Sequence, residues 1–117
     1  MPQITVDHSA ALTAAFDPAA LAEGLHAAVV EIAAATPAAC KTQFRPGSFT
    51  AVGHDTEGHA VLHVTIGLLA GRAAETKARL TEAVLELVGE HVRPDGLTLH
   101  ASAETRDLDA SYRKFDA

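Results

Sequence analysis

The same order of apolar periodicities occurs twice along the chain, and this duplication limits the fold more than any other feature. In each half, a segment that alternates apolar and polar residues precedes one with apolar residues every three or four positions, and a second alternating segment follows. Alternation is typical of a strand and the longer spacing of a helix. Residues 1–50 and 59–106 are therefore each predicted to form a βαβ unit, with a tail over 107–117.

The first unit begins with PQITVDH as a strand, and a helix is predicted over 16–35. Asp17 suits the N-cap of this helix, and Pro18 suits its first position, where a missing N–H costs nothing. Thr36-Pro37 is expected to end the helix. The segment CKTQFR then alternates as a second strand should.

The second unit repeats this order. HAVLHVTIGL is predicted to be a strand, the segment from Gly71 to Val92 a helix, and LTLHASAET a strand. The connection RPGSFTAVGHDTEGH contains proline, glycine and aspartate, which indicate either a strand extension or a hairpin loop.

Right-handed crossovers make the two strands within each unit parallel. Joined edge to edge, the two units give a single α+β domain over 1–117, with a four-stranded sheet and both helices on one face. The other face has no cover, and an exposed apolar sheet face is a liability. The core is also thin, because much of the 48% hydrophobic content is alanine and there is no Trp. Both points predict an oligomer.

The composition of the chain argues against several classes of partner and site. The formal net charge is −6 without a basic stripe, which argues against nucleic acid as a partner. Cys40 is the only cysteine, so no intrachain disulfide forms and a reducing compartment fits. We expect no signal peptide and no membrane span, since no apolar run approaches ~20 residues. The chain is accordingly predicted to be cytoplasmic. We expect no metal at His54, Asp55, His59 and His63, whose spacing is not a closed zinc pattern.

Three motifs suggest a family. The chain starts with MP, its strand LHVTI leads into AGRAAETKARL, and it ends with ETRDLDASYRKF. In order and spacing, over essentially the whole chain, it resembles the tautomerase superfamily, and within it the 5-carboxymethyl-2-hydroxymuconate isomerases. The resemblance implies a homotrimer of double βαβ chains with the sheets lining the inside. It also implies that tails such as this one pack near neighbouring subunits, where Tyr112 and Phe115 are candidate anchors.

The resemblance implies that Pro2 is the catalytic base. On position alone, a proline at a strand start needs no function, because its missing N–H can fall outside the ladder. As a free secondary amine after Met1 removal, however, Pro2 has a basic lone pair. An ordinary α-amino group titrates near ~8, and burial and nearby cations lower that value. The second unit starts inside the chain, so we expect one active site per chain.

The resemblance implies that two positively charged side chains bind carboxylates of the substrate. Arg72 lies in the GR motif at the predicted helix start, where a cation opposes the helix dipole; a solvated surface arginine is the alternative. The related isomerases carry arginines in the second strand, where this chain has Lys41, Gln43 and Arg45 on one face. Lys41 matches without a gap, and a shifted alignment gives Arg45. Lysine keeps the charge but loses the planar fork.

The predicted function is that of an isomerase which moves a proton within an unsaturated 2-hydroxy or 2-oxo polycarboxylic acid, in the breakdown of aromatic compounds. 5-Carboxymethyl-2-hydroxymuconate is the model substrate, and no cofactor is needed. Two alternatives stay open. One is another superfamily activity, such as phenylpyruvate tautomerase or acrylate dehalogenase or hydratase. The other is a trimeric binding protein that lacks catalysis.

Overall fold

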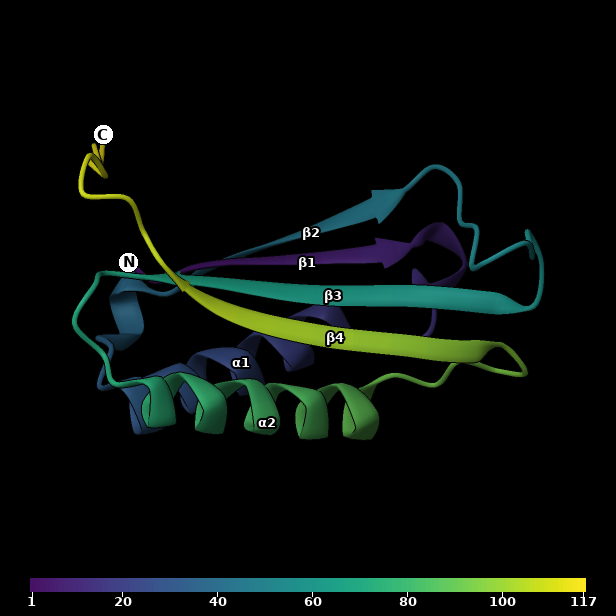
Figure 1. Ribbon diagram of the computed structural model, residues 1–117, viewed down its shortest axis with the longest axis horizontal. Coiled ribbons are helices and arrows are strands. Elements are labelled where there is room, and N and C mark those ends of the chain that lie inside the picture. The colour runs from purple at the N-terminus through teal and green to yellow at the C-terminus, as the bar shows by residue number, and fades with distance from the viewer.

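The two predicted units are present and pair through their first strands. The structure is a computed structural model that describes residues 1–117. The first unit contains β1 (Gln3–Ser9), α1 (Pro18–Ala33) and β2 (Lys41–Gly47), and the second contains β3 (His59–Leu68), α2 (Ala74–His91) and β4 (Thr98–Asp107). Strands within a unit are parallel, whereas β1 and β3 are antiparallel. The sheet order is therefore β2-β1-β3-β4 (Figure 1).

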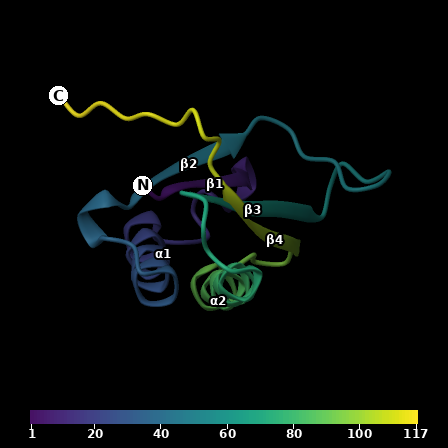
Figure 2. The same cartoon turned by 60° about the vertical axis from the view of Figure 1, so that its left-hand side comes forward.

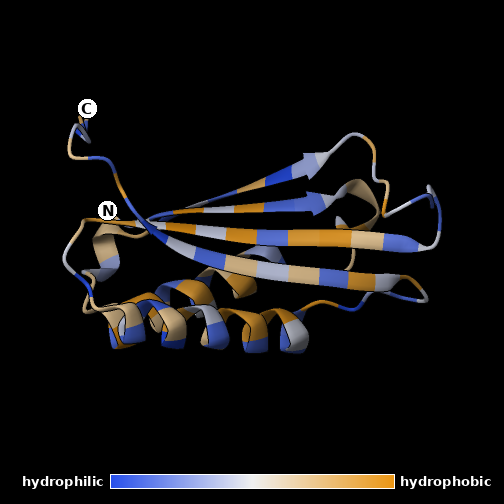
Figure 3. Ribbon diagram, viewed as in Figure 1, coloured by the Kyte–Doolittle hydropathy of each residue, from blue (hydrophilic) through white to orange (hydrophobic).

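Both helices cover the same face of the sheet, as predicted (Figure 2). Alternate residues of β1 and β3 point into this layer, which Figure 3 shows as apolar stripes along the strands. The core comprises Ile4, Val6, Leu12, Leu21, Leu25, Val29, Ala33, Ala60, Leu62, Val64, Ile66, Leu68, Leu80, Val84, Val88 and Val92. Burial of each large aliphatic side chain stabilises the fold by about 1.5–3 kcal/mol. Neither helix combines the length and the apolar character that crossing a membrane requires.

The predicted start of α1 is confirmed. The Asp17 carboxylate accepts hydrogen bonds from the backbone N–H groups of Ala19 at 3.0 Å and Ala20 at 3.4 Å. The helix ends at Ala33, because Ala34 adopts a left-handed conformation with φ 57°. This end precedes the predicted stop at Thr36-Pro37, where a short 3₁₀ turn, η2 (Pro37–Ala39), leads into β2.

The predicted start of α2 at Gly71 was wrong. The helix begins at Ala74, and Gly71 has a φ of 124°, which falls in the region that favours glycine. Residues 69–73 thus form a loop after β3. Arg72 lies in this loop, not in the first helical turn, so the expected conflict with the helix dipole does not arise.

The connection between the units is not a hairpin between β2 and β3, because β1 lies between those two strands. The predicted strand extension is present, since β2 continues to Gly47. Within the connection, Val52 and Asp55 exchange backbone hydrogen bonds of 2.9 Å in both directions. A second 3₁₀ turn, η1 (Ala10–Leu12), follows β1.

The open face of the sheet is polar, which corrects the expectation of an exposed apolar face. Position-by-position pairing places on this face the side chains of Gln3, Thr5, Asp7, Lys41, Gln43, Arg45, His59, His63, Thr65, His100, Ser102, Glu104 and Arg106. Val61 is the one large apolar residue of β3 whose side chain lies on this face. The open face can therefore contact water, and it gives no hydrophobic reason for an oligomer.

The two units begin in the same way. The backbone N–H of Lys41 donates to the Pro2 carbonyl at 3.2 Å, and that of Thr98 donates to the Gly58 carbonyl at 2.9 Å. Each bond joins the residue before the first strand of a unit to the first residue of its second strand. Because β1 and β3 are antiparallel, these two starting points lie at opposite ends of the sheet.

Candidate active site at the amino end of the sheet

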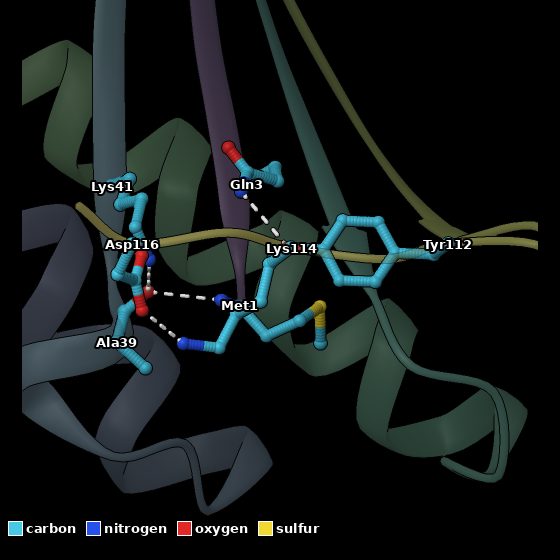
Figure 4. A network of polar contacts seen from close by, with 7 residues as sticks. All are labelled: Met1, Gln3, Ala39, Lys41, Tyr112, Lys114 and Asp116. Atoms are coloured by element: carbon cyan, nitrogen blue, oxygen red, sulfur yellow. Dashed lines mark hydrogen bonds and ion pairs between the residues drawn. The ribbon is translucent and has the colours of Figure 1, made fainter.

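Two positively charged groups meet at the amino end of β1. The amino-terminal nitrogen of Met1 donates a hydrogen bond to the Ala39 carbonyl at 3.1 Å. Lys41 Nζ donates to the same carbonyl at 3.2 Å (Figure 4). Ala39 ends the η2 turn, so the short segment between α1 and β2 positions both cations.

This environment disfavours the protonated form of the amine. Burial lowers the pKa of the Met1 amino group below its ordinary value of 8.0, and the charges of Lys41 and Lys114 lower it further. Removal of solvent and nearby positive charge both penalise an ammonium ion. At a given pH, an amine at this end of the sheet is therefore unprotonated more often than a free chain terminus in water.

Pro2 is held rigidly beside these cations. The residue is buried, and its carbonyl accepts the hydrogen bond from the Lys41 backbone N–H at 3.2 Å. Met1 is partly buried and packs against the core. The proline ring is thus fixed at the start of β1, whereas the nitrogen that carries the charge here belongs to Met1.

The structure separates the two alternatives for the second-strand cation. Lys41 pairs with Gln3 in the register of β1 and β2, next to Pro2. Arg45 pairs with Asp7, four residues further along, which is about 13 Å at the usual rise of a strand. Arg45 also binds the Asp7 carboxylate through Nε at 2.8 Å and Nη2 at 3.1 Å. Of the two, only Lys41 lies at the amino end.

Arg72 lies at the same end of the sheet, in the loop after β3, but it contacts backbone and not the amine. Its Nε and Nη2 donate to the Ala33 carbonyl at 3.2 and 3.0 Å, and Nη1 donates to the Leu69 carbonyl at 3.2 Å. A cation at the carboxyl end of α1 interacts favourably with the helix dipole and satisfies a terminal carbonyl. Arg72 therefore links the second unit to the end of α1 in the first unit.

The C-terminal tail also reaches this end of the sheet, which no local sequence pattern predicts. The backbone N–H of Leu108 donates to the Leu68 carbonyl at 2.7 Å, so the tail starts next to the last residue of β3. Gln3 Nε2 donates to the Tyr112 hydroxyl at 3.2 Å (Figure 4). Tyr112 is therefore an anchor within the chain, whereas Phe115 is 88% exposed.

Neither of two surface hollows is lined by Met1 or Pro2. One of about 480 Å³ lies beside Arg72, lined also by Ile32, Ala33, Ala34, Ala70, Gly71 and Thr76. Another of about 340 Å³ lies at the far end of β1 and includes Asp7, Arg45, His63 and Phe49. Because it is remote from Pro2, this second hollow has no part in chemistry at the amino terminus.

Two of the histidines considered as metal ligands, His59 and His63, contact neighbouring side chains. His59 Nε2 contacts an Asp55 carboxylate oxygen at 3.1 Å, and its Nδ1 contacts His100 Nε2 at 2.9 Å. His63 Nδ1 contacts the Ser102 hydroxyl at 2.7 Å. Both ring nitrogens of His59 are thus engaged by separate partners.

No protein-family model matches the sequence, and no curated protein matches it. Solved structures do match. A 5-carboxymethyl-2-hydroxymuconate delta-isomerase is 13% identical with a TM-score of 0.82, over 100% of this chain and 89% of that one. A 5-carboxymethyl-2-hydroxymuconate isomerase from Deinococcus radiodurans R1 is 19% identical with a TM-score of 0.83, over 98% and 90%. A fused 4-OT protein, solved as a symmetric trimer, is 22% identical with a TM-score of 0.69, over 91% and 85%.

These identities are low, but the superpositions span almost the whole length of each chain. They confirm, at the level of the fold, the resemblance that the MP start, the GR loop and the tail suggested. The chain has the double βαβ fold of these solved structures.

Proposed function

We propose that the protein is an isomerase of the tautomerase type, acting on an unsaturated 2-hydroxy or 2-oxo acid with more than one carboxylate, such as 5-carboxymethyl-2-hydroxymuconate. The observation that carries the proposal is the position of Pro2 beside Lys41: the Lys41 backbone N–H donates to the Pro2 carbonyl at 3.2 Å, and Lys41 pairs with Gln3 in the sheet. An amine base next to a fixed cation is what proton transfer in an anionic substrate requires.

Pro2 becomes the base once Met1 is removed. The amide nitrogen of an internal proline is not basic, whereas the secondary amine of a terminal proline is. The amine accepts the proton of the substrate 2-hydroxyl, and the same proton, or one exchanged with water, returns to a carbon of the conjugated system. The amine is regenerated and no cofactor is consumed.

Lys41 and Arg72 bind carboxylates of the substrate in this proposal. Lys41 also stabilises the negative charge that develops on the enolate oxygen. Arginine has five N–H donors, of which Arg72 uses three on the Ala33 and Leu69 carbonyls. Two remain for a substrate carboxylate, so the structural role and the binding role are compatible.

We also propose a homotrimer in the cytoplasm, serving the breakdown of aromatic compounds. The trimer is supported by the fold shared with the 4-OT trimer, and by large apolar side chains that one chain leaves exposed: Phe49 is 75% and Leu69 50% exposed. The single cysteine supports a reducing compartment.

The test is the ketonisation of 2-hydroxymuconate, followed by ultraviolet absorbance, for the wild-type chain and Pro2→Ala. Intact mass first establishes whether Met1 has been removed, and Pro94→Ala serves as a control proline at the other end of α2. We expect a wild-type rate that is lost in Pro2→Ala and kept in Pro94→Ala. Retained Met1, or equal rates in all three proteins, would eliminate Pro2 as the base. Absence of activity throughout would favour acrylate chemistry or the non-catalytic alternative.

A further inference from the structure

The last residues of the chain add a charged pair to the amino end of the sheet. The Lys114 ammonium group forms an ion pair with the Asp116 carboxylate (Figure 4). Neither residue belongs to the predicted site. The tail reaches this place because it is anchored twice, by Leu108 on Leu68 and by Tyr112 on Gln3.

The bend of the tail between these anchors is defined by local hydrogen bonds. The backbone N–H of Ser111 donates to the Asp109 carboxylate at 2.7 Å, and that of Tyr112 donates to the Asp109 carbonyl at 2.9 Å. Such a turn stiffens a short segment, because side chain and backbone of one aspartate fix the next residues. Residues 113–116 consequently continue from a fixed point next to Gln3.

The pair lies near the charged groups at the amino end of β1, as the close-up of Met1, Lys41, Lys114 and Asp116 shows (Figure 4). The charge of Lys114 acts on the amino-terminal nitrogen, together with that of Lys41. The pKa of the Asp116 carboxyl is lowered by Lys114 first, and also by Lys41 and the amino terminus. Asp116 is therefore an anion next to the two lysines Lys41 and Lys114, at the end of the sheet where a substrate carboxylate is expected.

We infer that Lys114 is a third cation of the site and binds the second carboxylate of a diacid. In the absence of substrate, the Asp116 carboxylate occupies the position of that second carboxylate, and the substrate displaces it. The inference rests on the proposed function for the identity of the substrate, but not for the binding of a dicarboxylate. Lys114 is 58% and Asp116 64% exposed, so the pair is weak and an incoming carboxylate can replace it.

Binding of adipate, a saturated diacid that cannot be isomerised, tests the inference without turnover; hexanoate is the matched monoacid. Dissociation constants are measured by NMR titration for the wild type, Lys114→Gln, Asp116→Asn and Arg113→Gln. Arg113 donates only to carbonyls of the tail itself, those of Ala110 and Tyr112, so it controls for the loss of one positive charge.

We expect Lys114→Gln to weaken adipate binding about two- to fivefold, the range of an exposed ion pair, and Asp116→Asn to strengthen it by a similar factor. Hexanoate binding should change little in either variant, and Arg113→Gln should match the wild type for both ligands. Equal effects of Lys114→Gln and Arg113→Gln, or equal effects on adipate and hexanoate, would overturn the inference.

The same variants are then assayed for turnover of 2-hydroxymuconate and of the enol of phenylpyruvate, which has one carboxylate. A rise in KM for the diacid alone, with kcat kept, supports the role of Lys114 in specificity. If no enol is turned over while adipate binding still depends on Lys114, the proposed reaction fails and the carboxylate site stands. If turnover is normal and KM is unchanged in Lys114→Gln, the site at Lys114 fails and the reaction stands.

Discussion

Gly67 and Leu108 lie so close together that a Cβ at position 67 would be 2.7 Å from Leu108 Cδ2, and the Leu108 side chain would have to move. Gly67 pairs with Gln3 on the open face of the sheet, so the Leu108 side chain covers the start of β1. The contact fixes the first residue of the tail beyond β4.

Gly67→Ala should accordingly displace the tail. We expect a loss of about 1–3 kcal/mol in the free energy of unfolding, the usual cost of overpacking, measured by urea denaturation. In a Leu108→Ala background, the same substitution should cost less, because the clashing atoms are gone. Additive losses in the double variant would show that the two side chains do not compete for this space.

The Arg72 guanidinium gives a prediction that separates its structural role from substrate binding. Arg72→Ala should lower the free energy of unfolding by about 1–3 kcal/mol, since it removes charged donors from the Ala33 and Leu69 carbonyls. Arg72→Lys should lose less, because it keeps a charge near the end of α1. If both variants are as stable as the wild type but have a raised KM, the structural role is refuted and only the binding role remains.

The N-cap of α1 can be tested with a near-isosteric control. Asp17→Ala should lower the free energy of unfolding by about 1 kcal/mol, because the N–H groups of Ala19 and Ala20 lose their acceptor. Asp17→Asn retains an acceptor oxygen at the same place and should be close to the wild type in the same urea titration. A loss of equal size in both would point to the charge of Asp17 instead.

The ion pair between Asp7 and Arg45 predicts a dependence of stability on pH. Hydrogen bonds from Arg45 lower the pKa of the Asp7 carboxyl below its ordinary 3.8. A carboxyl with a lower pKa in the folded chain contributes stability above its unfolded pKa, and this contribution is lost as the pH falls through the folded value. Urea titrations from about pH 6 to about pH 2.5 should therefore show a steeper loss in the wild type than in Asp7→Asn.

Arg45→Gln is the matched partner variant for that measurement, because Arg45 is the main cause of the shift. It should reduce the acid-induced loss of stability in the same way as Asp7→Asn. The same pH slope in all three proteins would contradict the assignment.

The sequence was sufficient for the architecture because each element carries its own period. The alternation of HAVLHVTIGL and the helical stripe through Leu80, Val84 and Val88 predicted elements that the structure confirms. The start of α2 was placed too early because Gly71-Arg72 has no property that excludes a helix. The helix begins only at Ala74, because Gly71 has a φ of 124°, which is not a helical conformation.

The part of the site that depends on strand pairing could be predicted from the sequence. The part that depends on contacts between residues far apart in the chain could not. The alternation of CKTQFR placed Lys41 on the open face, and the pairing of β1 with β2 brings it beside Pro2. The contact between Gln3 and Tyr112 joins residues 109 apart in the chain, and no local pattern signals it. The predicted apolar open face was wrong because the strands alternate: the positions between the core residues are polar, as Gln3, Thr5 and Asp7 of β1 show.

The same backbone hydrogen bond occurs in both units, from Lys41 to Pro2 and from Thr98 to Gly58. This equivalence limits where a reactive amine can arise in such a molecule. The fold offers two equivalent positions for a terminal amine, but a polypeptide has only one beginning. A circular permutant that joined the present termini and opened before His59 would transfer the ionisable end to the opposite side of the sheet. The position of the chain's start, and not a difference between the two βαβ units, would then decide which unit carries the reactive amine.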